Sequence, residues 1–242
     1  MPNRQRAAWS ARPAPKPAQP KSTGHELAIW SAVFAACAIG LVLALALFTR
    51  SGTAAPLGTP APVAVSTGVP ASGFTYGQAS ALVTIDLYED FQCPICREWF
   101  ETIFPQLRDN EIKAGTAKLV FHGFAFIGPE SAAADRAAYA AAAQGRFWDM
   151  WATLYSNQGT ENSGAFSDAR LRTMAAGLNL DLVRYDADFA SSAAAAWVSA
   201  GEADAAGAGV TGTPTMIIAG QSYSGVGSYA ALAAVIAAAA AR

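Results

Sequence analysis

Hydrophobic and polar positions in the C-terminal two thirds of the chain predict three strands. The stretch 81–89, ALVTIDLYE, is rich in β-forming residues and partly alternating, which is typical of a strand. The stretch 117–126, AKLVFHGFAF, has the same character. A short apolar run, PTMIIAG, follows at 214–220, and the next residues, SYSGVGS at 222–228, are turn formers. Long intervals therefore separate the expected strands.

Helical patterns fill the intervals between these strands. One helix is expected to begin at Cys93, where Asp90 or Gln92 could cap it and Pro94 suits its first position. Further helical segments are expected at 130–144, 146–155, 167–177, within 181–208 as one or two helices, and at 228–242. Strand, helix, strand, several helices, strand and helix in this order predict an α/β domain with a helical insertion over 73–242.

A second hydrophobic pattern lies near the N-terminus. Residues 27–48 form an uncharged run of 22 residues, long enough as a helix to cross a bilayer core about 30 Å thick. A cleaved signal peptide is the alternative, but its apolar region is usually about 7–15 residues. The nearest small-residue site, at 53–55, precedes Pro56, which we expect to hinder cleavage. We therefore predict an uncleaved transmembrane helix that binds the lipid bilayer.

Charge and composition divide the rest of the chain. Residues 1–26 carry five basic groups and one acid, without apolar periodicity, and are predicted to be a disordered tail that stays in the cytoplasm. Residues 49–72 are rich in Pro, Ala, Gly and Thr and are predicted to be a linker. The domain is then extracytoplasmic, on a single-pass membrane protein. Residues 51–242 carry ten basic and seventeen acidic groups, which does not favour a nucleic-acid partner.

Candidate chemistry centres on two of the three cysteines, Cys93 and Cys96, in the sequence DFQCPICREWF. At a helix N-terminus, unpaired N–H groups and the helix dipole favour a thiolate, so the pKa of Cys93 should be lowered. Cys96 lies one turn later, on the face that points into the core. The pattern predicts an exposed, activated first thiol and a covered second thiol that can displace what the first captures.

Two other interpretations of the pair are weaker. A structural zinc site requires four ligands, and beyond the pair the chain offers only Cys37, His25 and His122, of which the first two lie within or before the predicted span. His122 ends a strand and is more easily explained by packing or exposure than by catalysis. An inert disulfide closing so small a loop would stabilise little. Exchange chemistry explains the position better, and no metal is expected.

Three stretches resemble the DsbA-like branch of the thioredoxin fold. They are VTIDLYEDFQCPICREWFETIFPQL at 83–107, GRFWDMWATLY at 145–155 and GVTGTPTMIIAGQSYSG at 209–225. The resemblance covers about 75–240 and is closest to membrane-anchored extracytoplasmic members of Gram-positive bacteria. It implies a thioredoxin fold with an inserted helical subdomain, preceded here by the transmembrane helix. It also implies catalysis by the Cys93–Cys96 disulfide without another cofactor, and a cis-proline at Pro214.

The resemblance further implies a substrate groove beside the disulfide, formed by Pro94, Ile95, Thr213 and Pro214. Two positions depart from the family pattern. Many members have histidine where this chain has Ile95, which cannot donate a side-chain hydrogen bond, so we expect a less strongly oxidising pair. The buried acid that members often carry six residues before the first cysteine is Leu87 here. Glu89 and Asp86 are therefore the candidates for proton transfer.

The sequence thus predicts a membrane-anchored thiol–disulfide oxidoreductase that oxidises cysteines of exported proteins. The resemblance implies a quinone-linked membrane oxidase of DsbB or VKOR type as the partner that reoxidises it. A reductase or isomerase with the same chemistry is an alternative. A non-catalytic binding module at the membrane is another, although such a module would not require both sulfurs.

Overall fold

A computed structural model describes residues 57–66 and 68–242 of the 242-residue chain. The predicted cytoplasmic tail and transmembrane helix, at 1–26 and 27–48, lie outside the described residues and stay predictions. Within the part that the structure describes, no helix is both long and apolar enough to span a bilayer.

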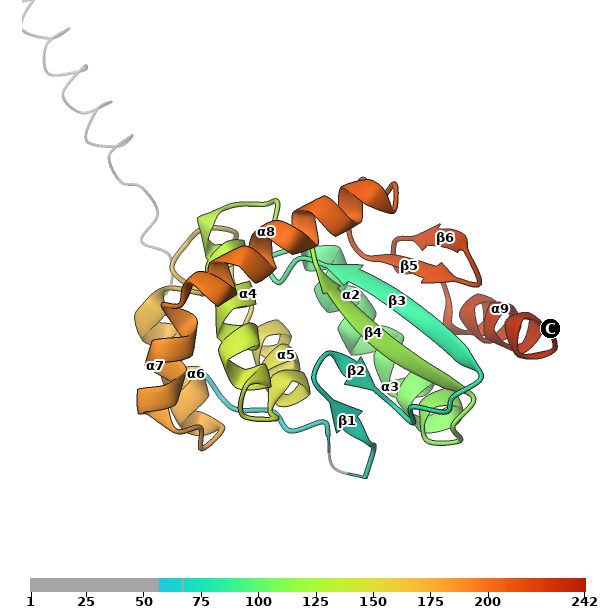
Figure 1. Cartoon of the computed structure of the whole chain (residues 1–242), viewed down its shortest axis with the longest axis horizontal. Coiled ribbons are helices and arrows are strands. Elements are labelled where there is room, and N and C mark those ends of the chain that lie inside the picture. The colour runs from blue at the N-terminus through green and yellow to red at the C-terminus, as the bar shows by residue number, and fades with distance from the viewer. Residues whose placement is uncertain (1–56, 67) are drawn as a thin grey trace, which may run out of the picture. The chain divides into compact units, whose positions relative to one another are not determined.

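A six-stranded mixed sheet forms the centre of the domain, with strand order β1-β2-β4-β3-β5-β6 (Figure 1). The strands are β1 (Ala71–Ser72), β2 (Thr75–Tyr76), β3 (Val83–Glu89), β4 (Ala117–Gly123), β5 (Thr215–Ile218) and β6 (Gln221–Ser224). β3 runs parallel to β4 and antiparallel to β5. The three predicted strands are confirmed as β3, β4 and β5. β1 and β2, of two residues each, were not predicted, and β6 occupies residues predicted as turn formers.

Some helices flank this sheet and others form a group to one side of it, as Figure 1 shows. They are α2 (Pro94–Thr102), α3 (Phe104–Leu107), α4 (Pro129–Ala142), α5 (Phe147–Ser156), α6 (Asp168–Gly177), α7 (Leu182–Phe189), α8 (Ser192–Gly207) and α9 (Tyr229–Ala240), with a π-helical turn at Arg108–Ile112. The five helices α4–α8 lie between β4 and β5 in sequence, so the predicted helical insertion is confirmed. α2 and β3 meet at the end of the sheet where the cysteines lie.

Helix α5 is buried along almost its whole circumference. Its residues 147–155 are all buried. The aromatic side chain of Trp151 makes edge-on contacts with Trp148 and Tyr155. One side of the helix is covered by the extended residues 57–66, which we call the N-terminal strap.

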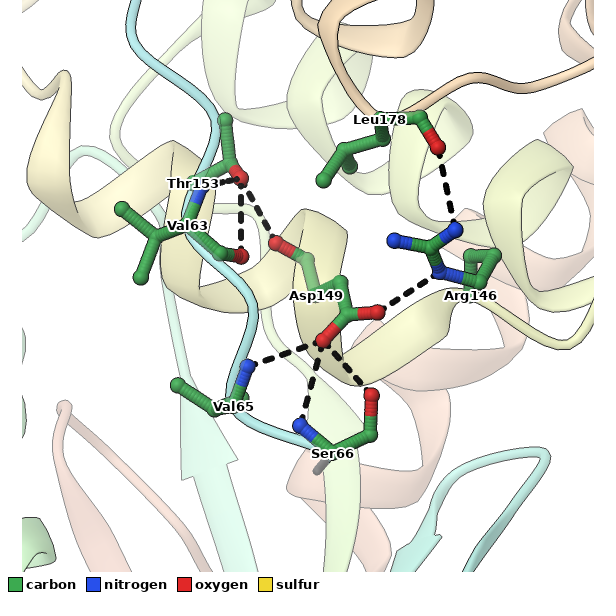
Figure 2. Close-up of polar contacts among 7 residues, drawn as sticks. All are labelled: Val63, Val65, Ser66, Arg146, Asp149, Thr153 and Leu178. Atoms are coloured by element: carbon green, nitrogen blue, oxygen red, sulfur yellow. Dashed lines mark hydrogen bonds and ion pairs between the residues drawn. The ribbon is translucent and has the colours of Figure 1, made fainter.

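The N-terminal strap is fastened to α5 by a regular series of hydrogen bonds (Figure 2). Asn157 Oδ1 accepts from Ala61 N at 2.9 Å, and Thr153 Oγ1 accepts from Val63 N at 2.9 Å. Asp149 Oδ1 accepts from Val65 N at 2.9 Å. Steps of two residues along an extended chain thus match steps of four along the helix, because both cover roughly 6–7 Å.

The strap corrects the predicted domain boundary. Residues 49–72 were predicted to be a linker and the domain to begin at 73, but Leu57–Arg242 forms one compact unit. Val65 and Val69 are buried in the hydrophobic core. The prolines and small residues suggested a free linker. In the structure, alternate valines bury one side of the strap, and side chains of α5 form hydrogen bonds with its backbone. The folded unit therefore includes the residues from Leu57 onward.

Candidate active site

The first cysteine is held at the N-terminus of α2. Cys93 is the N-cap residue, with φ −69° and ψ 117°, and Pro94 begins the helix. No side chain caps this end, so the predicted capping by Asp90 or Gln92 is wrong. The Asp90 carboxylate instead accepts from Gln92 N at 2.7 Å and from Ser131 Oγ at 2.6 Å. The open N–H groups of α2 are therefore left to the Cys93 sulfur.

The two thiols, both reduced, differ in their surroundings. Cys93 is 6% exposed, less than the sequence suggested, and Cys96 is completely buried. The adjacent Cys96 thiol lowers the pKa of Cys93 to about 6 against the opposing effect of burial, helped by Thr213 and by the N–H groups of Cys96 and Ile95. Burial raises the pKa of Cys96 well above its ordinary value. At neutral pH the first thiol is mostly ionised and the second is not.

The loop before β5 lies against the first cysteine. The Thr213–Pro214 peptide bond is cis, as the resemblance implied. Cys93 Sγ lies 3.4 Å from the carbonyl oxygen of Thr213. Pro94 and Ile95, which follow Cys93 in the chain, are exposed, with Ile95 42% accessible. The four residues expected to form a groove are therefore gathered around Cys93 from two distant segments.

The two proton-transfer candidates lie in different places. Glu89 is completely buried beneath the cysteines, and its Oε2 accepts from Trp151 Nε1 at 2.7 Å. Burial raises the pKa of Glu89 to about 8, despite the hydrogen bond from Trp151, and the charge of Glu89 in turn raises the pKa of Cys96. Asp86 faces the other side of β3, where its Oδ1 lies 3.1 Å from His122 Nε2. Only Glu89 lies where it could exchange a proton with the pair.

A polar network around the motif was not found from the sequence. Gln92 Nε2 donates to Ser131 Oγ at 2.9 Å and to Asn162 Oδ1 at 3.1 Å. Gln158 Nε2 donates to the carbonyl oxygens of Phe91 and Cys93. These partners lie 39 to 70 residues apart in the chain, so no local pattern indicates them. Among residues 57–66 and 68–242, no group of three or more His, Cys, Asp or Glu side chains is placed to hold a metal.

The comparison with family models places this geometry in a known context. Residues 71–238 match the family model described as Thioredoxin. The chain belongs to the thioredoxin family. The predicted thioredoxin fold with an inserted helical subdomain is thereby confirmed for the described residues.

Individual relatives agree in fold. A Bacillus cereus protein named "Probable disulfide bond formation protein D" is 38% identical over 85 residues, which cover 34% of this chain and 39% of that relative. The crystal structure of oxidised BdbD from Bacillus subtilis has a TM-score of 0.65 at 19% identity, covering 76% of this chain and 100% of that one. The thiol–disulfide exchange protein α-DsbA2 from Wolbachia pipientis has a TM-score of 0.60 at 20% identity, covering 68% and 85%. These structures support the DsbA-like fold.

Proposed function

We propose that the chain is a thiol–disulfide oxidoreductase in which Cys93 is the exchanging sulfur and Cys96 the resolving one. The observation that carries the proposal is the unequal pair: Cys93 has a pKa lowered to about 6 at the start of α2, and the pKa of buried Cys96 is raised. A sulfur that is stable as a thiolate is a good leaving group in exchange. The relatives named for disulfide bond formation and thiol–disulfide exchange support the same reaction.

In the oxidising direction, a client thiolate attacks Cys93 Sγ of the Cys93–Cys96 disulfide. The bond between the two protein sulfurs breaks, and Cys96 leaves as a thiolate. Buried Glu89, whose pKa is raised to about 8, holds a proton at neutral pH that Cys96 can take. A second client thiolate then attacks the client sulfur of the mixed disulfide and releases Cys93 as a thiolate. Two electrons pass from the client to the cysteine pair.

The client is proposed to bind along Thr213 and Pro214, opposite Pro94 and Ile95. A proline in this loop has no N–H to pair within the protein, and the Thr213 carbonyl beside Cys93 is an acceptor for an extended peptide. Ile95, 42% exposed, offers an apolar contact next to the exchanging sulfur. This arrangement suits unfolded segments with varied sequence, because backbone groups supply the binding.

The direction and place of the reaction are further parts of the proposal. The uncharged run 27–48 and the basic residues before it support a membrane-anchored, extracytoplasmic domain. Disulfides form and persist outside the cytosol, which supports oxidation of cysteines in exported proteins. A quinone-linked membrane oxidase would then restore the disulfide. Reduction or isomerisation of disulfides remains the alternative use of the same chemistry.

Trapping of mixed disulfides tests the exchange. With Cys96→Ser, the Cys93 thiolate attacks a disulfide of an unfolded client protein, and one client sulfur leaves as a thiolate. No second cysteine can then displace the client from Cys93, so mixed-disulfide complexes should accumulate. Cys93→Ser should give none while folding like the parent. A parent chain that exchanges no disulfides, yet binds a partner equally well with and without Cys93, would establish the binding-module alternative instead.

The redox potential tests the direction. Because the Ile95 side chain cannot donate a hydrogen bond to the thiolate, we expect a midpoint potential below that of DsbA, which is about −120 mV. Equilibration with glutathione, followed by alkylation and mass spectrometry of the 93–96 peptide, measures it. A potential as high as that of DsbA would contradict the argument from Ile95. A value near that of thioredoxin, about −270 mV, would favour the reductase alternative.

A further inference from the structure

The loop between α5 and α6, residues 157–166, touches the turn that carries the reactive cysteine. Gln158 Nε2 donates to the carbonyl oxygen of Phe91 at 2.7 Å and to that of Cys93 at 3.0 Å. Both hydrogens of one amide group are therefore directed at the backbone immediately around the thiol. Gln158 is only partly exposed, and it comes from an element 65 residues away from Cys93 in the chain.

The same loop makes a second connection to this turn. Asn162 N donates to Gln92 Oε1 at 2.6 Å, and Gln92 Nε2 donates back to Asn162 Oδ1 at 3.1 Å. The loop is itself held to the start of α4, since Glu130 accepts from Gly164 N at 2.6 Å and from Phe166 N at 2.8 Å. Because the loop is anchored to α4 as well as to Gln92, it can restrict the movement of the turn that carries Cys93.

The Cys93 carbonyl links the contacts of the loop to the position of the Cys93 sulfur. It accepts the first helical hydrogen bond of α2, from Arg97 N at 3.2 Å, and Gln158 occupies its remaining lone pair. The direction of this carbonyl fixes ψ of Cys93 at 117° and so fixes how Sγ meets the N–H groups of Ile95 and Cys96. Pro94 and the Arg97 N–H keep this angle in the extended region, and the Gln158 amide adds a restraint from a distant segment that holds the carbonyl in one direction within it.

We propose that Gln158 is a positioning residue for the reactive thiol: its amide fixes the Cys93 carbonyl, and through it the direction in which Sγ meets the first N–H groups of α2. The importance of Gln158 for disulfide exchange rests on the proposed function, whereas its effect on the Cys93 thiol does not. Loss of the amide would loosen the N-cap turn and weaken the contacts that favour the thiolate.

The test compares three variants of the full chain. Gln158→Met has the same length but donates nothing, and Gln158→His retains a donor at the same reach. Gln144→Met is the matched control, because the partly exposed Gln144 likewise bonds backbone groups through its amide, at Asp181 in the helical insertion. Mass spectrometry of the 93–96 peptide after pulse alkylation at a series of pH values gives the ionisation midpoint of Cys93 separately from Cys37.

We expect Gln158→Met to raise that midpoint by about 0.5–1 pH unit, which is roughly a 3- to 10-fold loss of thiolate at a pH below it. The equilibrium with glutathione should move toward the protein disulfide by a similar factor, because the reduced form loses its stabilised thiolate. Gln158→His and Gln144→Met should keep the parent midpoint, even if both unfold more easily than the parent.

An unchanged midpoint in a folded Gln158→Met protein, within about 0.2 units of the parent, would overturn the inference. Should that variant fail to fold, Gln158→Leu, which is also neutral and donates no hydrogen bond, takes its place. The same two outcomes then apply. If the parent forms no mixed disulfides, the proposed function fails, but the alkylation midpoint still decides the role of Gln158.

Discussion

The buried Glu89 makes the strongest prediction about stability. Burial favours the protonated form of this carboxyl group and raises the pKa of Glu89 from 4.5 to about 8. Between these values the folded chain holds a proton on Glu89 that the unfolded chain has lost. Stability contributed by the protonated group is therefore present below about pH 4.5 and is lost as the pH rises toward 8.

The magnitude follows from the difference between the two states. Each pH unit in this window lowers the free energy of unfolding by about 1.4 kcal/mol. At pH 7 the accumulated cost is about 3 kcal/mol, and at pH 5 it is less than about 1 kcal/mol. Glu89→Gln replaces the neutral acid by a neutral amide of the same shape and retains an acceptor for Trp151. The variant should therefore be more stable than the parent by about 3 kcal/mol at pH 7.

Urea unfolding at pH 5, 6, 7 and 8, with the cysteines kept reduced, measures the effect. The stability difference between Glu89→Gln and the parent should widen by about 2.5 kcal/mol from pH 5 to pH 7. Glu98→Gln, the same substitution at an exposed position of α2, is the control and should show no such widening. Parallel stability curves for Glu89→Gln and the parent would refute the reasoning, because Glu89 would then be ionised in the folded protein.

Three further predictions concern the scaffold. Asp149→Ala removes three hydrogen bonds from the strap and the ion pair with Arg146. It should lower the free energy of unfolding in urea by about 3–5 kcal/mol and make the strap sensitive to proteases. Unchanged stability would show that the strap is not bound. Burial of His122 opposes its protonation, but the hydrogen bonds that its ring donates to Asp86 and Asp204 outweigh this and raise its pKa. His122→Gln should therefore lower stability by up to about 1 kcal/mol at pH 6 and by less at pH 9. An equal loss at both pH values would contradict this. Gly201→Ala would place a Cβ against a backbone carbonyl of β4 and should destabilise the protein by about 1–3 kcal/mol in thermal unfolding. Gly207→Ala lies on the same helix, where the added Cβ meets open space, and should stabilise it by about 0.5–1 kcal/mol. Similar effects of the two substitutions would contradict the packing argument.

The strap and the reactive turn are connected through the end of α5. Asn157 binds Ala61 of the strap, and the next residue, Gln158, binds the backbone of Cys93. Both sets of contacts are made by polar side chains that act on another segment's backbone. A fragment that began at 73 would therefore lose the strap beside the element that holds the active site, which argues for experiments on a chain that retains residue 57 onward.

The amino-acid sequence by itself determined the helices and strands that depend on interactions between neighbouring residues. Alternation over 83–89 and 117–123 gave two central strands, and alanine-rich segments closed by glycine gave the helices of the insertion. The position of Cys93 before Pro94 at the end of a strand indicated a helix N-terminus. These features are predictable because propensity and periodicity act over a few neighbouring residues, and a helix end acts on the thiol that follows it directly in sequence.

Tertiary structure alone decided which distant groups share the active site. The pleat of β3 sends Glu89 and Asp86 to opposite faces. Only the packed structure shows that Glu89 is buried against Trp151, whereas Asp86 meets His122. The strap is bound, although its composition resembles a linker, because side chains on α5 pair its backbone. Gln158 has no signal in the sequence, since its role depends on two carbonyls that only the folded chain brings within 3 Å of its amide. Long-range packing creates such contacts, and local sequence patterns do not encode it.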